Sequence, residues 1–261
     1  GEGQMVCPSA LALDDEGSLF LADDKLNRIT IFDSEGSTVS SWGVKGAGEG
    51  EFDGPSGLLF QGKDLLVVDH RNSRVQKYSR EGKFIEQWGS QGEGDGEFNL
   101  PWGISSDKDG NIYVADWRND RVQRFSPDGE FIDMFGIHGN GDNQFNRPSD
   151  VAVDDDGFIY VADWVNQRVQ VFDAGWNFQA SLRGQATVSP WAQEYLEANA
   201  DELDARSRFN PYIEVDTDVP HEVSARVEAF FWDPIAVEID PDGRLIVADS
   251  LRHRLQVYKR A

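Results

Sequence analysis

The stretch YVADWRNDRVQRF, residues 113–125, returns 47 positions later as YVADWVNQRVQVF, residues 160–172. Both copies hold an Asp followed five residues later by an Arg, and this pair recurs in five repeats along the 261-residue chain. The five pairs are Asp23 with Arg28, Asp69 with Arg74, Asp116 with Arg121, Asp163 with Arg168, and Asp249 with Arg254. Successive Asp residues of these pairs lie 46, 47, 47 and 86 residues apart, so a repeat of 46 to 47 residues is interrupted once.

Each repeat has the composition of four short β-strands. In the third repeat, the segments GISSD, NIYVAD, RVQRF and EFIDMFG are rich in β-branched and aromatic residues and are bounded by Gly, Asp, Asn or Pro. The Asp-Gly pairs between strands provide the positive φ that tight hairpins need. They resemble part of a calcium-binding loop, but the spaced Asp ligands and the closing Glu of such a loop are absent. The pattern predicts an all-β fold, a β-propeller in which each repeat forms one blade.

The repeats resemble those of the NHL family. The shared pattern is a Pro, a short strand, Asp-Gly, a strand like IYVAD, an Asn, RVQxF, and then WG followed by GxGEF. The likeness covers residues 1–183 and 231–260, and it implies an NHL-type β-propeller, commonly of six blades. The family includes RNA binders, protein-interaction modules, sensor domains and a few lyases. The resemblance therefore implies a fold and a binding face, but no single activity.

A single propeller domain is expected over residues 1–261. Its repeats cover approximately residues 8–54, 55–100, 101–147, 148–183 and 234–260. The opening GEGQMVCP aligns with GEGEFDGP at residues 48–55, and the last repeat ends after its third strand. Because an open ring leaves unpaired strand edges, we expect this sequence to lack about one N-terminal blade of a six-bladed ring.

The long interval between the fourth and fifth repeats contains an insertion, residues 184–231, that has a helical pattern. We expect three helices in it: one starting at Ser189 and Pro190, with Trp191, Tyr195, Leu196 and Ala198 on its apolar side, a second over Asp201–Phe209, and a third over Pro220–Phe230. Two roles are open for the insertion. It covers an exposed edge or the seam of the ring, or it forms a lid over a binding site.

Composition restricts the class of partner. The chain has 47 Asp plus Glu against 24 Lys plus Arg, and this net charge of -23 argues against binding to nucleic acid or to anionic membranes. With 39% hydrophobic residues and eight Trp, we expect a folded, soluble monomer. The only cysteine, Cys7, excludes an intrachain disulfide framework. There is no signal-peptide pattern and no apolar run of membrane-spanning length, and the compartment stays open.

Residues that recur in every repeat are interpreted differently from those that vary. A pair found in every blade is a structural device, in which the Asp accepts turn amides and the Arg clamps it or a neighbouring carbonyl. A specific site needs asymmetry, so the variable positions on the loop face around the channel mouth are better candidates. The candidate ligand-binding residues are His70, Arg71, Trp102, Trp117, Arg118, Arg147, Asp150, Trp164, Arg252 and His253, with Trp232 nearby. Trp and Arg together suit an acidic peptide, a sugar or a carboxylated small molecule; alternatively, they pack between blades and form surface ion pairs.

The four histidines allow a second interpretation. His70, His138, His221 and His253 all fall in segments predicted on the loop face, and related propeller lyases use histidines around the channel. The gluconolactonase type uses a metal set of Glu, Asn and Asp, for which only Asp150 has a convincing position. We therefore predict a non-enzymatic propeller without a cofactor that binds a protein partner or small ligand on its loop face. The alternative is a metal-assisted lyase or hydrolase, of the amidating-lyase, streptogramin-lyase or gluconolactonase type, with one divalent cation at the central channel.

Overall fold

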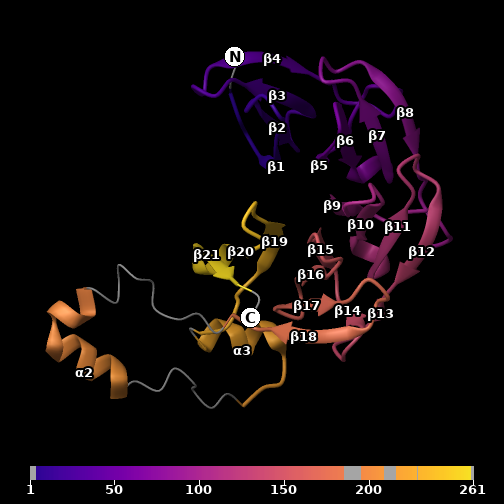
Figure 1. The fold of residues 1–261 in the computed structure, drawn as a ribbon. Coiled ribbons are helices and arrows are strands. Elements are labelled where there is room, and N and C mark those ends of the chain that lie inside the picture. The colour runs from indigo at the N-terminus through magenta and orange to yellow at the C-terminus, as the bar shows by residue number, and fades with distance from the viewer. Residues whose placement is uncertain (1–3, 185–194, 209–215, 228, 260–261) are drawn as a thin grey trace.

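The protein is arranged as a series of β-sheets along an arc. The computed structural model describes residues 4–184, 195–208, 216–227 and 229–259, and within them five blades follow one another from the indigo to the yellow end of the chain (Figure 1). Blades 1 to 4 each hold four antiparallel strands in chain order, and blade 5 holds three. The predicted β-propeller fold, with one sequence repeat per blade, is therefore confirmed.

The strands of each blade are here called a to d in chain order. Blade 1 holds β1 (Pro8–Leu13), β2 (Leu19–Asp23), β3 (Arg28–Phe32) and β4 (Thr38–Trp42). Blade 2 holds β5 (Pro55–Gln61), β6 (Asp64–Asp69), β7 (Arg74–Tyr78) and β8 (Phe84–Trp88). Blade 3 holds β9 (Pro101–Ser106), β10 (Ile112–Asp116), β11 (Arg121–Phe125) and β12 (Phe131–Phe135). Blade 4 holds β15 (Pro148–Val153), β16 (Ile159–Asp163), β17 (Arg168–Phe172) and β18 (Phe178–Leu182), and blade 5 holds β19 (Pro234–Ile239), β20 (Leu245–Asp249) and β21 (Arg254–Tyr258).

Two kinds of loop meet on one face of the arc. The b–c turn joins the second and third strands, and in three blades it contains a short 3-10 helix: η1 (His70–Asn72), η2 (Trp117–Asn119) and η3 (Ser250–Arg252). The d–a connection leads from one blade to the next, and between blades 3 and 4 it contains β13 (Ile137–His138) paired with β14 (Gln144–Phe145). Backbone hydrogen bonds tie each b–c turn to the preceding d–a connection, as from Arg118 N to Asn99 O at 3.0 Å. These two sets of loops form the loop face.

The hydrophobic core lies between consecutive blades. Phe20 and Ile29 of blade 1 pack with Leu65 and Tyr78 of blade 2, and equivalent clusters join blades 2 and 3, 3 and 4, and 4 and 5. Among the described residues no such cluster joins blade 5 to blade 1, and Figure 1 shows the arc open between them. Burial of apolar side chains between neighbouring sheets thus sets the order of the blades along the arc.

The insertion is helical where it is described. Residues 195–198 are helical, followed by α2 (Ala200–Arg208) and α3 (Pro220–Arg226), close to the second and third predicted helices. The predicted start of the first helix, at Ser189, Pro190 and Trp191, lies outside the described residues. Helix α3 lies beside β18 and the last blade (Figure 1), where Arg252 donates to the carbonyl oxygens of Ser224 and Val227. None of the described helices has the length and apolar character needed to cross a membrane.

Candidate functional site

The recurring Asp–Arg pairs are buried and connect loops to one another. The Arg Nε lies 2.7–2.8 Å from the Asp Oδ2 in four blades, in the pairs Asp69 with Arg74, Asp116 with Arg121, Asp163 with Arg168, and Asp249 with Arg254. In blade 3, the Asp116 carboxylate also accepts the amide of Asn99, while Arg121 donates to carbonyl oxygens of the same d–a connection. The carboxylate and guanidinium groups hydrogen-bond the b–c turn to the d–a connection, so they are not available to a ligand.

Blade 1 departs from this arrangement and corrects the expectation of five equivalent pairs. Asp23 accepts the amides of Val6 and Cys7 and two turn amides, and it forms no ion pair with Arg28 among the described residues. Arg28 instead donates Nη2 to the carbonyl oxygen of Gln4 at 2.7 Å, and its buried Nε has no partner. Backbone amides saturate the carboxylate in this blade, so the guanidinium is displaced from it.

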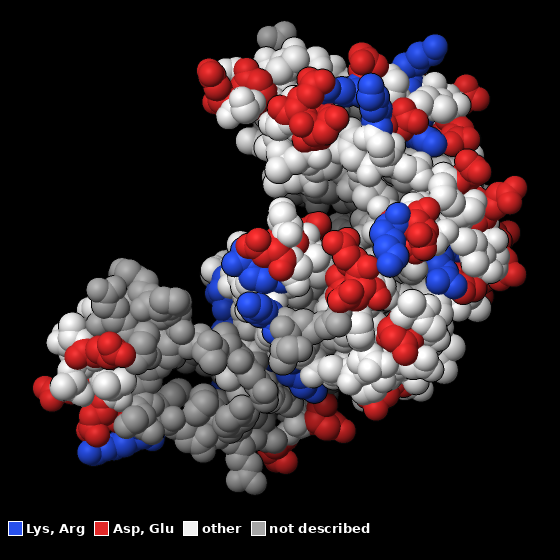
Figure 2. Space-filling view, viewed as in Figure 1, with Lys and Arg blue, Asp and Glu red and all other residues white. Residues whose placement is uncertain are grey.

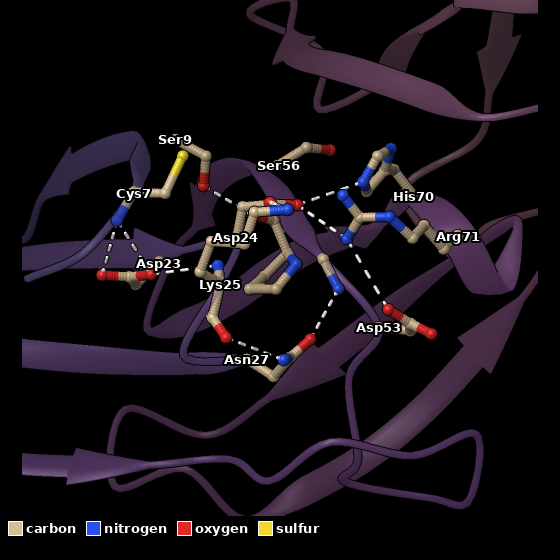
Figure 3. A network of polar contacts seen from close by, with 12 residues as sticks. Cys7, Ser9, Asp23, Asp24, Lys25, Asn27, Asp53, Ser56, His70 and Arg71 are labelled. Atoms are coloured by element: carbon tan, nitrogen blue, oxygen red, sulfur yellow. Dashed lines mark hydrogen bonds and ion pairs between the residues drawn. The ribbon is translucent and has the colours of Figure 1, made fainter.

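His70 and Arg71 belong to a polar network between blades 1 and 2 (Figure 3). Asp24 Oδ1 lies 3.2 Å from His70 Nε2 and 2.8 Å from Arg71 Nη1, and Arg71 also lies 3.6 Å from Asp53. Burial lowers the pKa of His70, and the Arg71 charge lowers it further, so the imidazole is neutral near pH 7. Burial is the largest single influence on Asp24 and opposes its ionisation, but the hydrogen bond from Arg71 and the positive charges of Arg71 and Lys25 together outweigh it and lower the Asp24 pKa. The network joins two blades, and Arg71 and Lys25, both ion-paired to Asp24, extend from it into solvent.

The candidates from blades 3 and 4 come together on the loop face. The rings of Trp117 and Trp164 are stacked, with centroids 6.0 Å apart and planes 28° apart. The guanidinium carbons of Arg118 and Arg147 lie 5.3 Å and 4.9 Å from the Trp117 centroid. Both Arg residues are exposed, and neither guanidinium forms an ion pair within the part of the chain that the structure describes. We call these four residues the Trp–Arg surface; three separate loops of two blades contribute to it.

Asp150 lies in the wall of the channel, apart from any histidine contact. It accepts the amide of Val151 at 2.9 Å and that of Val237, on the inner strand of blade 5, at 3.0 Å. It keeps partial solvent access, yet desolvation by the surrounding strands outweighs the two amide hydrogen bonds, which favour the carboxylate, and raises its pKa to about 8, with a smaller contribution from the Glu238 charge. A side chain at Gly103, the same position in blade 3, would place its Cβ 2.0 Å from Asp150 Oδ1. Asp150 thus joins the inner strands of blades 4 and 5 by hydrogen bonds and packs closely against Gly103 in that of blade 3.

The remaining candidates lie in separate contacts. Trp102 packs edge-on against His70, with ring centroids 4.9 Å apart. Arg252 lies 5.3 Å from the Trp232 ring and holds α3 against blade 5 through two carbonyl oxygens. His253 is an exposed turn residue with positive φ.

The histidines do not converge on one centre. His70 contacts Asp24, His138 Nδ1 lies 2.8 Å from Asp120, and His221 Nδ1 lies 3.7 Å from Asp233. Among the described residues no group of three or more His, Cys, Asp or Glu side chains has a geometry that could hold a metal ion. Asp150, with both carboxylate oxygens directed at backbone amides, does not fit the cation expected at the channel, and we derive no step through one.

Charged side chains and pockets are distributed unevenly over the molecule. Figure 2 shows acidic side chains over much of the visible face, with basic side chains in smaller, separate groups. A cavity of about 740 Å³ is lined by inner strands and by the a–b turns of blades 4 and 5, including Asp155 and Asp242. A second pocket, lined by Arg168 and Arg183, lies between blade 4 and α3. Arg183 is not one of the candidates predicted from the sequence. In blade 4 it stands between strand d and the following Gly, whereas in blades 1 to 3 the Gly follows strand d directly.

Comparison with known proteins agrees with this architecture. The model of the NHL repeat matches residues 98–125, 145–172 and 231–258, in the third, fourth and fifth repeats. Among solved structures, virginiamycin B lyase from Staphylococcus aureus is 11% identical, with a TM-score of 0.60 over 98% of this chain and 71% of that one. A streptogramin B lyase is 14% identical, with a TM-score of 0.60 over 97% and 68% of the two chains.

A protein of unknown function from Bacteroides caccae is 13% identical, with a TM-score of 0.58 over 93% of this chain and 70% of that one. Identities this low establish a shared fold and leave the activity open. A search of curated proteins found no significant match. The repeat matches, together with the blade architecture, show that the chain contains NHL repeats arranged as the blades of a β-propeller.

Proposed function

We propose that this protein is a non-enzymatic binding propeller whose loop face recognises a protein partner or small ligand carrying acidic and aromatic groups. The observation that supports the proposal is the Trp–Arg surface. Two stacked indole rings and two exposed guanidinium groups, which form no ion pair with any described residue, lie in loops of adjacent blades. Indole faces stack with aromatic rings, and the two Arg residues are positioned for charge-assisted hydrogen bonds to a carboxylate.

Electrostatics favours such a ligand at this place. On a chain with a net charge of -23, long-range repulsion opposes the approach of an acidic molecule in general. The two Arg side chains over the Trp117 ring offset this repulsion only for a ligand that contacts the Arg residues and the indole rings together. The surface is therefore selective. Trp and Arg are also the residues most often found to dominate binding energy at interfaces.

The separate histidine contacts support binding over a metal-assisted lyase or hydrolase. The lyase structures are similar to this chain in fold, at 11% and 14% identity. In the described residues, His70, His138 and His221 each contact a different Asp in a different loop. A reaction centre would require several such groups to converge on one reacting atom.

The test uses fluorescence anisotropy with two labelled peptides of equal length, one rich in Glu and Tyr and one rich in Lys and Tyr. We expect saturable binding of the acidic peptide alone. Trp117→Ala should weaken that binding by about 30-fold, corresponding to the roughly 2 kcal/mol of a central aromatic contact. Arg147→Gln should weaken it by about five-fold, as expected for an exposed charge-assisted contact.

Arg244→Gln is the matched control, because Arg244 is exposed and lies in the a–b turn of blade 5, outside the loop face. It should bind the acidic peptide as the wild type does. A thermal-shift screen of small aromatic carboxylates extends the same test to small ligands, and only a shift that is lost in Trp117→Ala counts as binding at the Trp–Arg surface. Equal binding of both peptides, or binding that survives Trp117→Ala unchanged, would overturn the proposal.

A further inference from the structure

A second pocket, of about 310 Å³, lies between blade 4 and α3 and shares no residue with the Trp–Arg surface. Its wall includes the side chains of Arg168, Arg183, Asn140 and Asn166, together with the apolar Val223 and Phe230. The pocket thus brings two Arg and two Asn residues together with apolar residues. Such a combination of a few polar groups with apolar lining is typical of small-molecule sites.

Arg183 is an addition found only in blade 4. In blades 1 to 3, strand d is followed directly by a glycine with positive φ, as at Trp42 and Gly43. In blade 4 Arg183 stands between the end of β18 and Gly184, which has the same positive φ. No requirement of the repeat explains this residue, because the other blades close the same connection without it.

The Arg183 guanidinium has no polar partner in the described structure. Its Nε is buried without a hydrogen bond, and its guanidinium carbon lies 5.1 Å from the centroid of the Phe230 ring. Burial lowers the pKa of Arg183, and the nearby Arg168 charge lowers it further. A buried cation without a counter-ion is costly, and an anion in the pocket would offset that cost.

Arg168 also lacks a contact that its equivalents in blades 2 and 3 make through Nη1. Arg74 Nη1 donates to Gln87 and Arg121 Nη1 contacts Met134, the residues of strand d that lie beside them. The equivalent residue of strand d in blade 4 is Ser181, as the pairing register shows. Within the described part of the chain, Arg168 donates through Nε and Nη2 alone, so its Nη1 has no partner there.

We infer that this pocket binds a small organic carboxylate with an apolar body. The two guanidinium groups would hold the carboxylate, and the apolar body would lie against Phe230 and Val223. The exposed carboxylate of Asp218 also lines the pocket and forms no ion pair with either Arg. It selects against ligands with a second negative charge on that side, because like charges repel at close range.

Isothermal titration calorimetry of the intact protein tests the inference, with sodium benzoate, sodium acetate and inorganic phosphate as probes in low-chloride buffer. We expect saturable binding of benzoate with 1:1 stoichiometry, and weaker binding of acetate because its apolar body is only a methyl group. Arg183→Gln should weaken benzoate binding by at least about tenfold, as expected for a hydrogen bond to a charged group. Asp218→Asn should leave benzoate binding equal to or tighter than that of the wild type.

Arg147→Gln and Trp117→Ala are the controls that separate this pocket from the Trp–Arg surface. Both should bind benzoate as the wild type does, so the failure of one proposal leaves the other intact. Thermal unfolding of Arg183→Gln without ligand should occur at or above the wild-type temperature, because an unpaired buried charge has been removed. The inference is overturned if no probe binds, if phosphate binds more tightly than benzoate, or if Arg183→Gln binds benzoate with wild-type affinity.

Discussion

Arg121 and Arg118 are three residues apart in blade 3, yet they differ in almost every physical respect. Arg121 is buried, and its three nitrogens donate to the Asp116 carboxylate, to carbonyl oxygens of the d–a connection and to Met134 Sδ. Arg118 is exposed, lies over Trp117 and has no ion pair in the described structure. The saturated residue recurs in every repeat, and the unsaturated one does not. Saturation thus distinguishes residues that hold the blades together from residues that remain available to a ligand.

The largest loss of stability is expected when the hydrogen-bonded pair of Asp116 and Arg121 is broken. Asp116→Ala removes the acceptor of Arg121, Asn119 and the Asn99 amide, and should lower the free energy of unfolding by about 3–5 kcal/mol. Urea denaturation followed by circular dichroism measures this. Arg118→Ala in the same turn is the control, with a change within about 0.5 kcal/mol. A loss below 1 kcal/mol for Asp116→Ala would contradict the assigned role.

A second prediction concerns Asp150, whose carboxylate is hydrogen-bonded and yet poorly solvated. Its pKa of about 8 in the folded protein lies above the ordinary value of 3.8, so the folded state binds the proton more tightly than the unfolded state. This contribution to stability is complete below about pH 4 and is lost as the pH rises towards 8. The stability of the wild type relative to Asp150→Asn should therefore fall by about 1 kcal/mol or more between pH 5 and pH 8.

Denaturation curves of both proteins at these two pH values measure the difference. Asp155→Asn is the control, because Asp155 is an exposed carboxylate of the a–b turn of blade 4. Its stability relative to the wild type should not change with pH in this window. A constant difference between Asp150→Asn and the wild type would show that the Asp150 carboxylate is well solvated.

The smallest effect is expected in blade 1. Arg28 forms no ion pair with Asp23 and leaves its Nε without a partner, so Arg28→Gln should change the free energy of unfolding by about 0.5 kcal/mol or less. Arg121→Gln, the equivalent change in blade 3, should cost several-fold more. Parallel urea titrations of the two variants compare them directly. Equal losses would mean that Arg28 and Asp23 interact as the other pairs do.

Much of the fold was predictable from local patterns. The strand pairs, the Asp-Gly turns and two helices of the insertion follow from residue spacing, because alternation and turn residues act over a few positions. The structural role of the Asp–Arg pair also follows from its recurrence. The missing Asp23–Arg28 ion pair in blade 1 does not follow from the sequence pattern. It depends on which backbone amides around Val6 and Cys7 reach Asp23.

The candidate site was only partly predictable. Variation among repeats drew attention to Trp117, Arg118, Arg147 and Trp164, and the structure brings these four residues together. The same reasoning grouped them with His70 and Asp150, which lie in other contacts. Arg183 was overlooked because its significance comes from a missing partner, and a missing partner is visible only when all neighbours are known.

By itself, the sequence determined the repeat, the four-stranded blade and the division between recurring and variable residues, because these depend on local periodicity and hairpin chemistry. The tertiary structure alone decided that Arg147 and Arg118 lie over one indole ring and that Arg168 and Arg183 line one pocket. The physical reason is that side chains from different loops meet only after apolar burial between blades has fixed the position of each sheet.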